Sequence, residues 1–584
     1  MTDAETETVR CRSLIVGAGA AGARAAIAMS RSGLEPLVVS KRDHGDAHTT
    51  WARGGINAAL GNVDGDDSCE VHAADTLDEG HFVNDPEAVE VVTSEAPDRI
   101  RELDDWGMDF SRTKDGEINQ RYFGAQAYPR TCFAGDHTGE SMLDALVGKA
   151  QEIGIPYRDN VMITRLLSDG GKVYGAVGYD MEDGGFVRFL AGAVVLAAGG
   201  ATAVYSRHSS REEENNGDGA ALAYEAGAEL MDMEFVQFHP TGMVGERYGE
   251  DWDGRLVTEA VRGDGGVLRN SEGERFMFEY SEMDRPELDA RDVVARGIAN
   301  EIDEGRGTEN GGVYLDISDE DRDYIRERLP RMYERFESLG VDIAEEPMEV
   351  APTAHYAMGG VDFDPRTGET GVESLYVVGE TTAGVHGANR LGGNSLAETV
   401  TVGKLVGEYV ASQEPIAPDE EPDLGHGSEE EFERLRTKLD TDGSVRVDGV
   451  VEELGELMED HAGIRRDSDG LREGLERLDG IRKKTDSLGI DGGITSVEFE
   501  FAVDLEFMVT VAEGILCGAL ERTESRGAHY RDDHTERSRD WRKNILYRET
   551  DDGMSLRTSE PGEPNEGVKR ALDEEHELEY HHLE

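Results

Sequence analysis

The chain of 584 residues is too long for a single hydrophobic core, so we expect it to divide into two to four domains. Its 125 acidic residues against 59 basic ones give a net charge of -66, which argues against nucleic-acid binding and suggests a halophilic source, because concentrated salt screens self-repulsion. The four cysteines lie far apart with no C-x-x-C pair, which argues against disulfides and against zinc or iron–sulfur ligation, and the polar N-terminus shows no signal peptide.

The first predicted elements are a strand, a tight turn and a helix. The β-branched run 14–16 leads into Gly17-Ala18-Gly19-Ala20-Ala21-Gly22, and an alanine-rich helix follows. Gly17 permits the turn, Gly19 lets the backbone approach a pyrophosphate, and Gly22 lets the helix pack on the strand. The second strand ends at Ser40-Lys41, where nicotinamide enzymes often carry an acid for the ribose. The motif therefore predicts a dinucleotide site, and not a simple nicotinamide one.

A histidine stands shortly after this fingerprint. His48-Thr49 lies six positions before the pair Gly54-Gly55. This arrangement suggests a flavin tethered through an imidazole. The alternative is a surface histidine near a glycine turn.

Strand and helix patterns alternate from about residue 9 to 235, which is typical of an open parallel sheet. The uncharged run 189–206 is interrupted by glycines, so we interpret it as a buried strand and turn, not a membrane span. Asn216-Gly217-Asp218-Gly219 then opens an alanine-rich helix. From residue 238 short strands and polar helices indicate an inserted domain.

The sheet resumes at the strand 375–380, which ends in Glu380. The proline-rich acidic stretch 412–428 is typical of a linker, and the apolar spacing of 429–522 predicts a helical bundle. From residue 551 the chain is acidic and poor in apolar residues, which predicts a mobile tail. The assigned units are a dinucleotide-binding domain of residues 1–237 and 352–412, an inserted domain of 238–351, a helical domain of 429–548 and an acidic tail of 549–584.

Five segments in the middle of the chain concentrate histidines and arginines in an otherwise acidic sequence. They are 237–242, 258–263, 290–296, 353–356 and 386–395, and they carry His239, Arg291, His355 and Arg390. An arginine offers a two-pronged fork to a carboxylate, and a histidine can donate to its other oxygen. The four side chains could therefore clamp a dicarboxylate. Each one alone is more often structural, so only their convergence would make a site.

The order of these motifs resembles the succinate dehydrogenase and fumarate reductase flavoprotein subunit family, over about residues 10 to 548. The matching segments are His48-Thr49 before Gly54-Gly55, Gln120-Arg121-Tyr122-Phe123-Gly124, Arg130-Thr131-Cys132, Asn216-Gly217-Asp218-Gly219, His239-Pro240-Thr241-Gly242, Arg291-Asp292-Val293-Val294, 386–395 and 522–529. The resemblance implies an α/β fold, in which an FAD-binding Rossmann-like domain carries an inserted α+β capping domain and a C-terminal helical domain.

The resemblance also implies the chemistry, which is hydride transfer between a small dicarboxylate and flavin N5 with a proton passing on the other face. Arg291 would be the general acid/base and Glu259 would orient it or relay its proton. The residues that would hold or press on the substrate are His239, Thr258, His355, Arg390 and Phe123. FAD, joined covalently to His48, would also meet Gly17, Gly19, Gly22, Ser40, Lys41, Thr49, Gly54, Gly55, Asp218, Glu380, Ser395 and Leu396.

Partners follow from the same resemblance. Electrons would pass through membrane anchor subunits and a separate iron–sulfur subunit, which would hold this cytoplasmic chain at the cytoplasmic face of the membrane. One alternative is L-aspartate oxidase, because residues 315–356 of this chain also resemble that enzyme. That enzyme lacks the tethering histidine and places an acid near the substrate amine, whereas residues 123–128 contain no carboxylate. A second alternative is a flavin scaffold with little turnover of a dicarboxylate. The presence of both Arg291 and Arg390 is evidence against a pure scaffold.

Overall fold

The central sheet of the dinucleotide-binding domain is parallel. In a computed structural model, which describes residues 6–211, 213–422, 427–441, 443–551 and 553–573, its strand order is β18-β11-β2-β3-β7. The buried strand β2 lies at its centre and leads through the glycine turn into helix α1, as predicted. The bounds are β2 Ser13–Val16, α1 Ala20–Arg31, β3 Pro36–Val39, β7 Tyr157–Arg158, β11 Val194–Leu196, β18 Leu375–Val377 and α11 Asn394–Ser412.

Helices α1 and α11 pack closely because glycines face alanines. A Cβ on Gly407 of α11 would lie 2.4 Å from the backbone oxygen of Ala25, and one on Gly403 would lie 2.8 Å from that of Ala21. This packing fixes the start of α11 beside the glycine turn of α1. The chain that returns from the inserted domain therefore reaches the dinucleotide site.

A second sheet differs from the predicted alternation of strands and helices. Its order is β1-β10-β9-β8, and β8, β9 and β10 are antiparallel, with only the pair β1 and β10 parallel. Gly170 and Gly171, with φ of 59° and 81°, form the tight turn between β8 and β9. Such a hairpin needs no connecting helix. The bounds are β1 Thr6–Cys11, β8 Val161–Asp169, β9 Lys172–Asp180 and β10 Phe186–Ala191.

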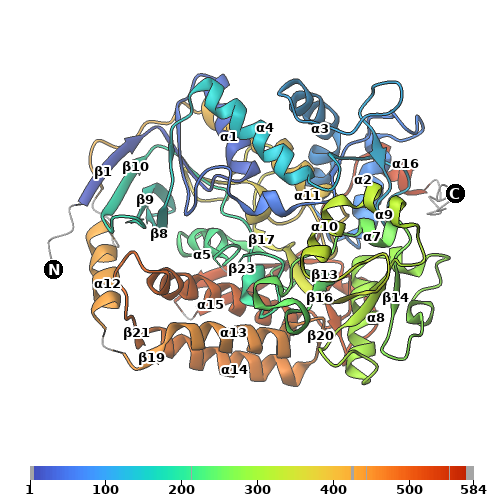
Figure 1. The fold of residues 1–584 in the computed structure, drawn as a ribbon. Helices are drawn as coiled ribbons and strands as arrows, with labels where there is room; N and C mark the ends of the chain where they lie inside the picture. The colour runs from blue at the N-terminus through green and yellow to red at the C-terminus, as the bar shows by residue number, and fades with distance from the viewer. Residues whose placement is uncertain (1–5, 212, 423–426, 442, 552, 574–584) are drawn as a thin grey trace.

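The inserted domain is built on an antiparallel sheet of order β13-β16-β15-β14, with helices beside it (Figure 1). Its own core contains Met243, Leu315 and Phe336. The expected boundaries at 238 and 351 fall inside β13 and β16, which pair with each other, so the chain enters and leaves this domain on adjacent strands. The bounds are β13 Val236–Met243, β14 Val267–Arg269, α8 Arg291–Asp303, β15 Val313–Asp316, α9 Arg322–Arg328, α10 Pro330–Ser338 and β16 Met348–Ala357.

The predicted helical domain is present and lies along one side of the molecule (Figure 1). Helix α15 is its most buried element and carries Asp504, which is inaccessible to solvent and binds Lys41 of the dinucleotide domain. No helix in the described ranges is long and apolar enough to cross a membrane. The bounds are α12 Ser428–Asp440, α13 Val447–Ala462, α14 Ser468–Thr485 and α15 Val497–Glu521.

The prediction of a tail from residue 549 is wrong for residues 553–573. Strand β24 (Gly553–Ser559) pairs antiparallel with β23 (Asn544–Thr550), whose other edge joins β12 (Leu230–Met231). Helix α16 (Glu566–Asp573) buries Val568 and Ala571 against α2 (Cys69–Glu79). Backbone pairing and a few apolar contacts order this acidic segment despite its composition. Residues 574–584 lie outside the described part of the chain.

Candidate active site

One long cavity joins the glycine turn of the dinucleotide domain to the inserted domain. Gly17, at φ +111°, admits the turn, and a Cβ there would lie 2.1 Å from the backbone oxygen of Ala197. A Cβ on Gly22 would lie 2.0 Å from Gly17 O, so Gly22 serves the packing of helix on strand, and it is not among the cavity-lining residues. The other predicted cofactor residues all line the cavity, namely Gly17, Gly19, Ser40, Lys41, His48, Thr49, Gly54, Gly55, Asp218, Glu380, Ser395 and Leu396.

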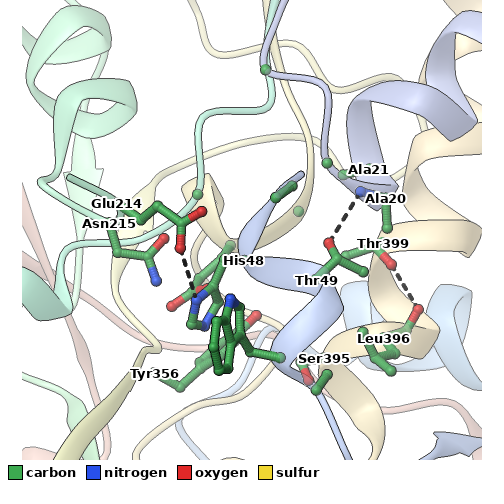
Figure 2. A pocket seen from close by; sticks show the side chains of 18 of the residues that line it. Ala20, Ala21, His48, Thr49, Glu214, Asn215, Tyr356, Ser395, Leu396 and Thr399 are labelled. Carbon is green, nitrogen blue, oxygen red and sulfur yellow. Dashed lines mark hydrogen bonds and ion pairs between the residues drawn. The ribbon is translucent and has the colours of Figure 1, made fainter. Parts of the chain in front are cut away.

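The 3₁₀ turn η1 (His48–Trp51) forms one wall of this cavity. Thr49 Oγ1 accepts a hydrogen bond of 3.2 Å from Ala20 N at the first turn of α1, which fixes η1 against the glycine turn. Figure 2 shows the His48 ring directed toward Glu214 within the pocket. His48 Nδ1 lies 3.7 Å from Glu214 Oε2, and it is buried with no hydrogen-bond partner among the described residues. Burial acts to lower the pKa of His48, but the Glu214 carboxylate outweighs it and holds that pKa above its usual value.

Lys41 and Glu380 are the charged groups on the cofactor side of the cavity, and each has defined neighbours. Lys41 Nζ donates to both carboxylate oxygens of Asp504, at 2.8 and 2.9 Å, and lies 4.0 Å from Asp218. Its ammonium is therefore engaged by the helical domain. Burial raises the pKa of Glu380 to about 7, against the opposing effect of His48. Glycine backbone, an imidazole held beside a carboxylate and a buried acid together fit a flavin dinucleotide.

The two predicted histidines meet on adjacent strands of the inserted domain. His239 on β13 and His355 on β16 have ring centroids 5.4 Å apart at 76°. His239 Nδ1 accepts from Thr241 N at 3.2 Å, which leaves the proton of the neutral ring on Nε2. His355 Nδ1 lies 2.8 Å from Ser209 Oγ. Loss of hydration and the charges of Arg291 and Arg390 hold both pKa values well below the usual one, so both rings are neutral at neutral pH.

The two predicted arginines also converge. Arg291, the first residue of α8, donates to Gln237 Oε1 at 3.0 Å, and Arg390 donates to the same oxygen at 2.9 Å. Arg390 Nε is buried without a hydrogen-bond partner in the described part of the chain, and burial and the charge of Arg291 lower the pKa of Arg390 to about 9. Two guanidinium groups thus share one neutral acceptor. This pairing leaves positive charge in the cavity that the two histidines also line.

Glu259 supplies the carboxylate beside Arg291. Its Oε2 accepts from Nε and Nη2 of Arg291, both at 3.1 Å, and lies 3.7 Å from Arg262. Burial acts to raise the pKa of Glu259, but Arg291 and Arg262 outweigh it and bring that pKa to about 2. Glu259 is therefore an anion that orients Arg291.

Thr258 and Phe123 complete the lining of the cavity at this end. Thr258 lies directly before Glu259 and is buried. A Cβ on Gly54 would lie 2.8 Å from the Phe123 ring, and one on Gly392 would lie 3.3 Å from it. The ring therefore packs between the turn after η1 and the segment that carries Arg390. The structure brings all seven predicted substrate and catalytic residues to one end of the cavity.

Sequence reasoning missed three contributors. Gln237 bridges the arginines, Glu214 faces His48, and Ser209 orients His355. Gln237 stands two positions before His239 on a strand, which puts both on one face. That spacing could have identified Gln237 as a residue of the site. Ser209 and Glu214 lie in a loop with no periodic pattern. Within the described ranges, no group of three metal-ligating side chains occurs.

Comparison with known proteins gives two matching family models. The model for an FAD binding domain matches residues 12–396, and the model for the fumarate reductase flavoprotein C-terminus matches residues 451–570. A fumarate reductase (CoM/CoB) subunit of Methanothermobacter marburgensis is 45% identical over 545 residues, which cover 93% of this chain and 98% of that protein. A mitochondrial succinate dehydrogenase [ubiquinone] flavoprotein subunit of Xenopus laevis is 37% identical over 546 residues, which cover 89% and 80% of the two chains.

Two solved structures superpose on nearly the whole length of this chain. Mycobacterium smegmatis Sdh1 in complex with UQ1 superposes with a TM-score of 0.87 at 40% identity, covering 98% of each chain. A quinol-fumarate reductase with menaquinol molecules superposes with a TM-score of 0.89 at 34% identity, covering 96% of this chain and 99% of that one. The predicted three-domain α/β fold is thereby confirmed.

Proposed function

Since this chain belongs to the succinate dehydrogenase and fumarate reductase flavoprotein family, we propose that its cavity interconverts succinate and fumarate. Arg291 would be the proton donor, and the residues that would clamp the dicarboxylate are Arg390, His239, His355 and Thr258. One observation carries the proposal, namely that Arg291 and Arg390 share the single neutral acceptor Gln237 Oε1. Glu259 pairs with Arg291, but no carboxylate among the described residues pairs with Arg390. The two adjacent cations therefore favour an anionic ligand, because a paired charge is less costly to bury than an unpaired one.

The clamp would hold the two ends of the dicarboxylate separately. Arg390 would take one carboxylate with its planar fork, and the Nε2–H groups of His239 and His355 would donate to the remaining oxygens. Thr258 would add a hydroxyl donor. Phe123 would press on the carbon pair and exclude water.

Bound FAD supplies a hydride donor and acceptor. Arg291 would give or take the proton on the opposite face of the substrate, and Glu259 would orient the guanidinium and return the proton after turnover. The inserted domain, joined by the paired strands β13 and β16, would act as the cap that shuts out solvent.

Two finer points are also proposed. His48, which lines the cavity beside Glu214, would hold FAD covalently. The chain would work at the cytoplasmic face of the membrane as the flavoprotein subunit of a complex with membrane anchors and an iron–sulfur subunit, since its relatives carry subunit names. Co-purification of an iron–sulfur protein with the native chain would support this assembly.

Turnover with an artificial electron carrier tests the proposed function. The purified flavoprotein should oxidise succinate or reduce fumarate, and L-aspartate should give a far smaller kcat/KM. Faster turnover of L-aspartate than of succinate would overturn the proposal in favour of an L-aspartate oxidase. No turnover of any dicarboxylate, with FAD bound, would leave only the scaffold alternative.

A further inference from the structure

Arg53 and Arg335 line the same cavity from two different domains and are here called the vestibule arginines. Arg53 follows η1 in the dinucleotide domain, and Arg335 belongs to α10 in the inserted domain. Both line the cavity that also holds His239 and Arg390. The proposed clamp and proton donor use neither of them.

Their position is close to the substrate end of the cavity. Arg335 Nη1 donates to Leu256 O at 3.4 Å, two residues before Thr258. Arg53 directly precedes Gly54, which touches the Phe123 ring. An anion between the vestibule arginines would therefore lie next to the residues proposed to bind substrate.

Each of these two side chains lies near an aromatic ring, and one of the rings, that of Trp51, is shared with Arg255 at 4.7 Å. The guanidinium carbon of Arg335 lies 5.5 Å from the centre of the Trp252 ring, and that of Arg53 lies 6.0 Å from the centre of the Trp51 ring. An arginine above an aromatic face keeps its N–H groups free to bind a ligand at their edge.

The nearby acids are already engaged by another arginine. Arg331, one turn before Arg335 on α10, binds Glu140 at 2.6 Å, and its backbone N–H donates to Asp136 at 3.1 Å. In the part of the chain that the structure describes, no carboxylate lies within 4.0 Å of Arg53 or Arg335.

The charge on the vestibule arginines is compensated only from a distance, by Asp136 for both and also by Glu140 for Arg53. Arg53 Nη1 is buried, and no residue that the structure describes forms a hydrogen bond with it. Burial and then the charge of Arg53 lower the pKa of Arg335 to about 10, while burial and then the charge of Arg331 lower the pKa of Arg53. A pair of partly buried cations of this kind gains free energy when a small anion comes between them.

We propose that Arg53 and Arg335 form an anion-binding vestibule that receives one carboxylate of the substrate before the clamp takes both. The inference rests on the proposed function. It answers a physical problem of this chain, whose net charge of -66 repels a dicarboxylate dianion from most of the surface. A local cationic pair in a cleft raises the concentration of such an anion and its association rate.

The test compares Arg335→Gln and Arg53→Gln with the matched control Arg326→Gln. Arg326 lies on α9 of the same domain, has a half-exposed side chain and pairs with Glu337, so its loss removes the same charge outside the cavity. For each full-length, FAD-loaded protein, fumarate reduction gives kcat and KM at low and high KCl, and the change in flavin absorbance on adding malonate gives a Kd. Flavin content is measured in parallel.

We expect Arg335→Gln and Arg53→Gln each to raise KM for fumarate and Kd for malonate by about tenfold at low salt, with much smaller changes in kcat. Their kcat/KM should also depend less steeply on KCl than that of the wild type. Arg326→Gln should match the wild type in all of these. Equal malonate Kd values for all four proteins, or a loss confined to kcat, would overturn the vestibule. If the wild type itself neither turns over fumarate nor binds malonate, the proposed function fails and not merely the vestibule.

Discussion

Arg291 and Glu259 form a forked ion pair in which one carboxylate oxygen accepts from two guanidinium nitrogens, both at 3.1 Å. The pair leaves Nη1 of Arg291 to Gln237 and directs the guanidinium into the cavity that the histidines line. An arginine fixed in this way can meet a substrate carbon at one defined angle. A lysine has no such planar fork, so the two residues are not interchangeable here.

Replacing Arg291 by Gln removes the proposed proton donor. We expect kcat for fumarate reduction to fall by about 10² to 10⁴, which is the usual contribution of a positioned acid. Malonate should still bind, although more weakly, and flavin content should stay normal. The control Arg269→Gln removes a cation of the inserted domain that pairs with Asp316 on its sheet, and it should keep kcat within about twofold of the wild type. A similar kcat for Arg291→Gln and Arg269→Gln would exclude the proposed role.

Gln237 offers a nearly isosteric test of the charge in the clamp. Gln237→Glu places a carboxylate between Arg291 and Arg390, where it neutralises the charge that we expect the substrate to use. KM for fumarate should rise by about 10- to 100-fold, equivalent to about 1.4 to 2.8 kcal/mol. Gln413→Glu, at the exposed end of α11, adds the same charge elsewhere and should leave KM unchanged. An unchanged KM in Gln237→Glu would mean that the two arginines do not bind the dicarboxylate.

Much of the cofactor site followed from local chemistry. The turn at Gly17 and Gly22 needs glycine for reasons that concern only neighbouring atoms, so the strand, turn and helix were predictable from a few residues. The helical domain was predictable in the same way, from apolar spacing. The acidic segment after residue 549 was not, because β24 is ordered by its pairing with β23, and composition does not report pairing.

The clamp is formed by segments that lie far apart in the sequence and come together only in the fold. His239 and His355 are adjacent because β13 pairs with β16, a contact between strands more than a hundred residues apart in the chain. Sequence motifs identified the residue types, and the resemblance supplied their roles. Gln237 escaped notice because a buried amide becomes informative only when both of its arginine donors are in place.

His48 can be tested without measuring turnover. If the histidine holds FAD covalently, flavin fluorescence should stay with the acid-denatured polypeptide on a gel, and His48→Ala should abolish that signal while binding FAD reversibly. His44→Ala is the matched control, since His44 lies in the same segment but binds Asp159 at 2.6 Å. Fluorescence that runs with the dye front in the wild type would show that the cofactor is bound without a covalent bond.

The neutral state of His239 makes stability depend on pH. Its folded pKa lies well below the value of 6.5 expected in the unfolded chain, so below pH 6.5 only the unfolded chain takes up the proton. Stability is then lost as the pH falls, by up to about 1.4 kcal/mol per pH unit for this one group. The Tm of the wild type should therefore fall more steeply between about pH 7 and pH 5 than that of His239→Asn. His534→Asn, at an exposed position, should follow the wild type, and parallel curves for all three would contradict the assignment.

The net charge of -66 predicts a strong dependence of stability on salt. The acidic residues repel one another in dilute buffer, and a Debye length that shortens from about 10 Å at 0.1 M to about 3 Å at 1 M removes most of that repulsion. The Tm of the full chain should therefore rise steadily as KCl increases toward molar concentrations. Sucrose, which stabilises folded proteins by exclusion but screens no charge, serves as the control: it should raise the Tm by a similar amount at low and at high KCl, and so it cannot replace the salt. A Tm that is the same with and without KCl would remove the proposal of a salt-adapted protein, because it would mean that the surface carboxylates are already compensated by pairs such as Arg557 with Glu229.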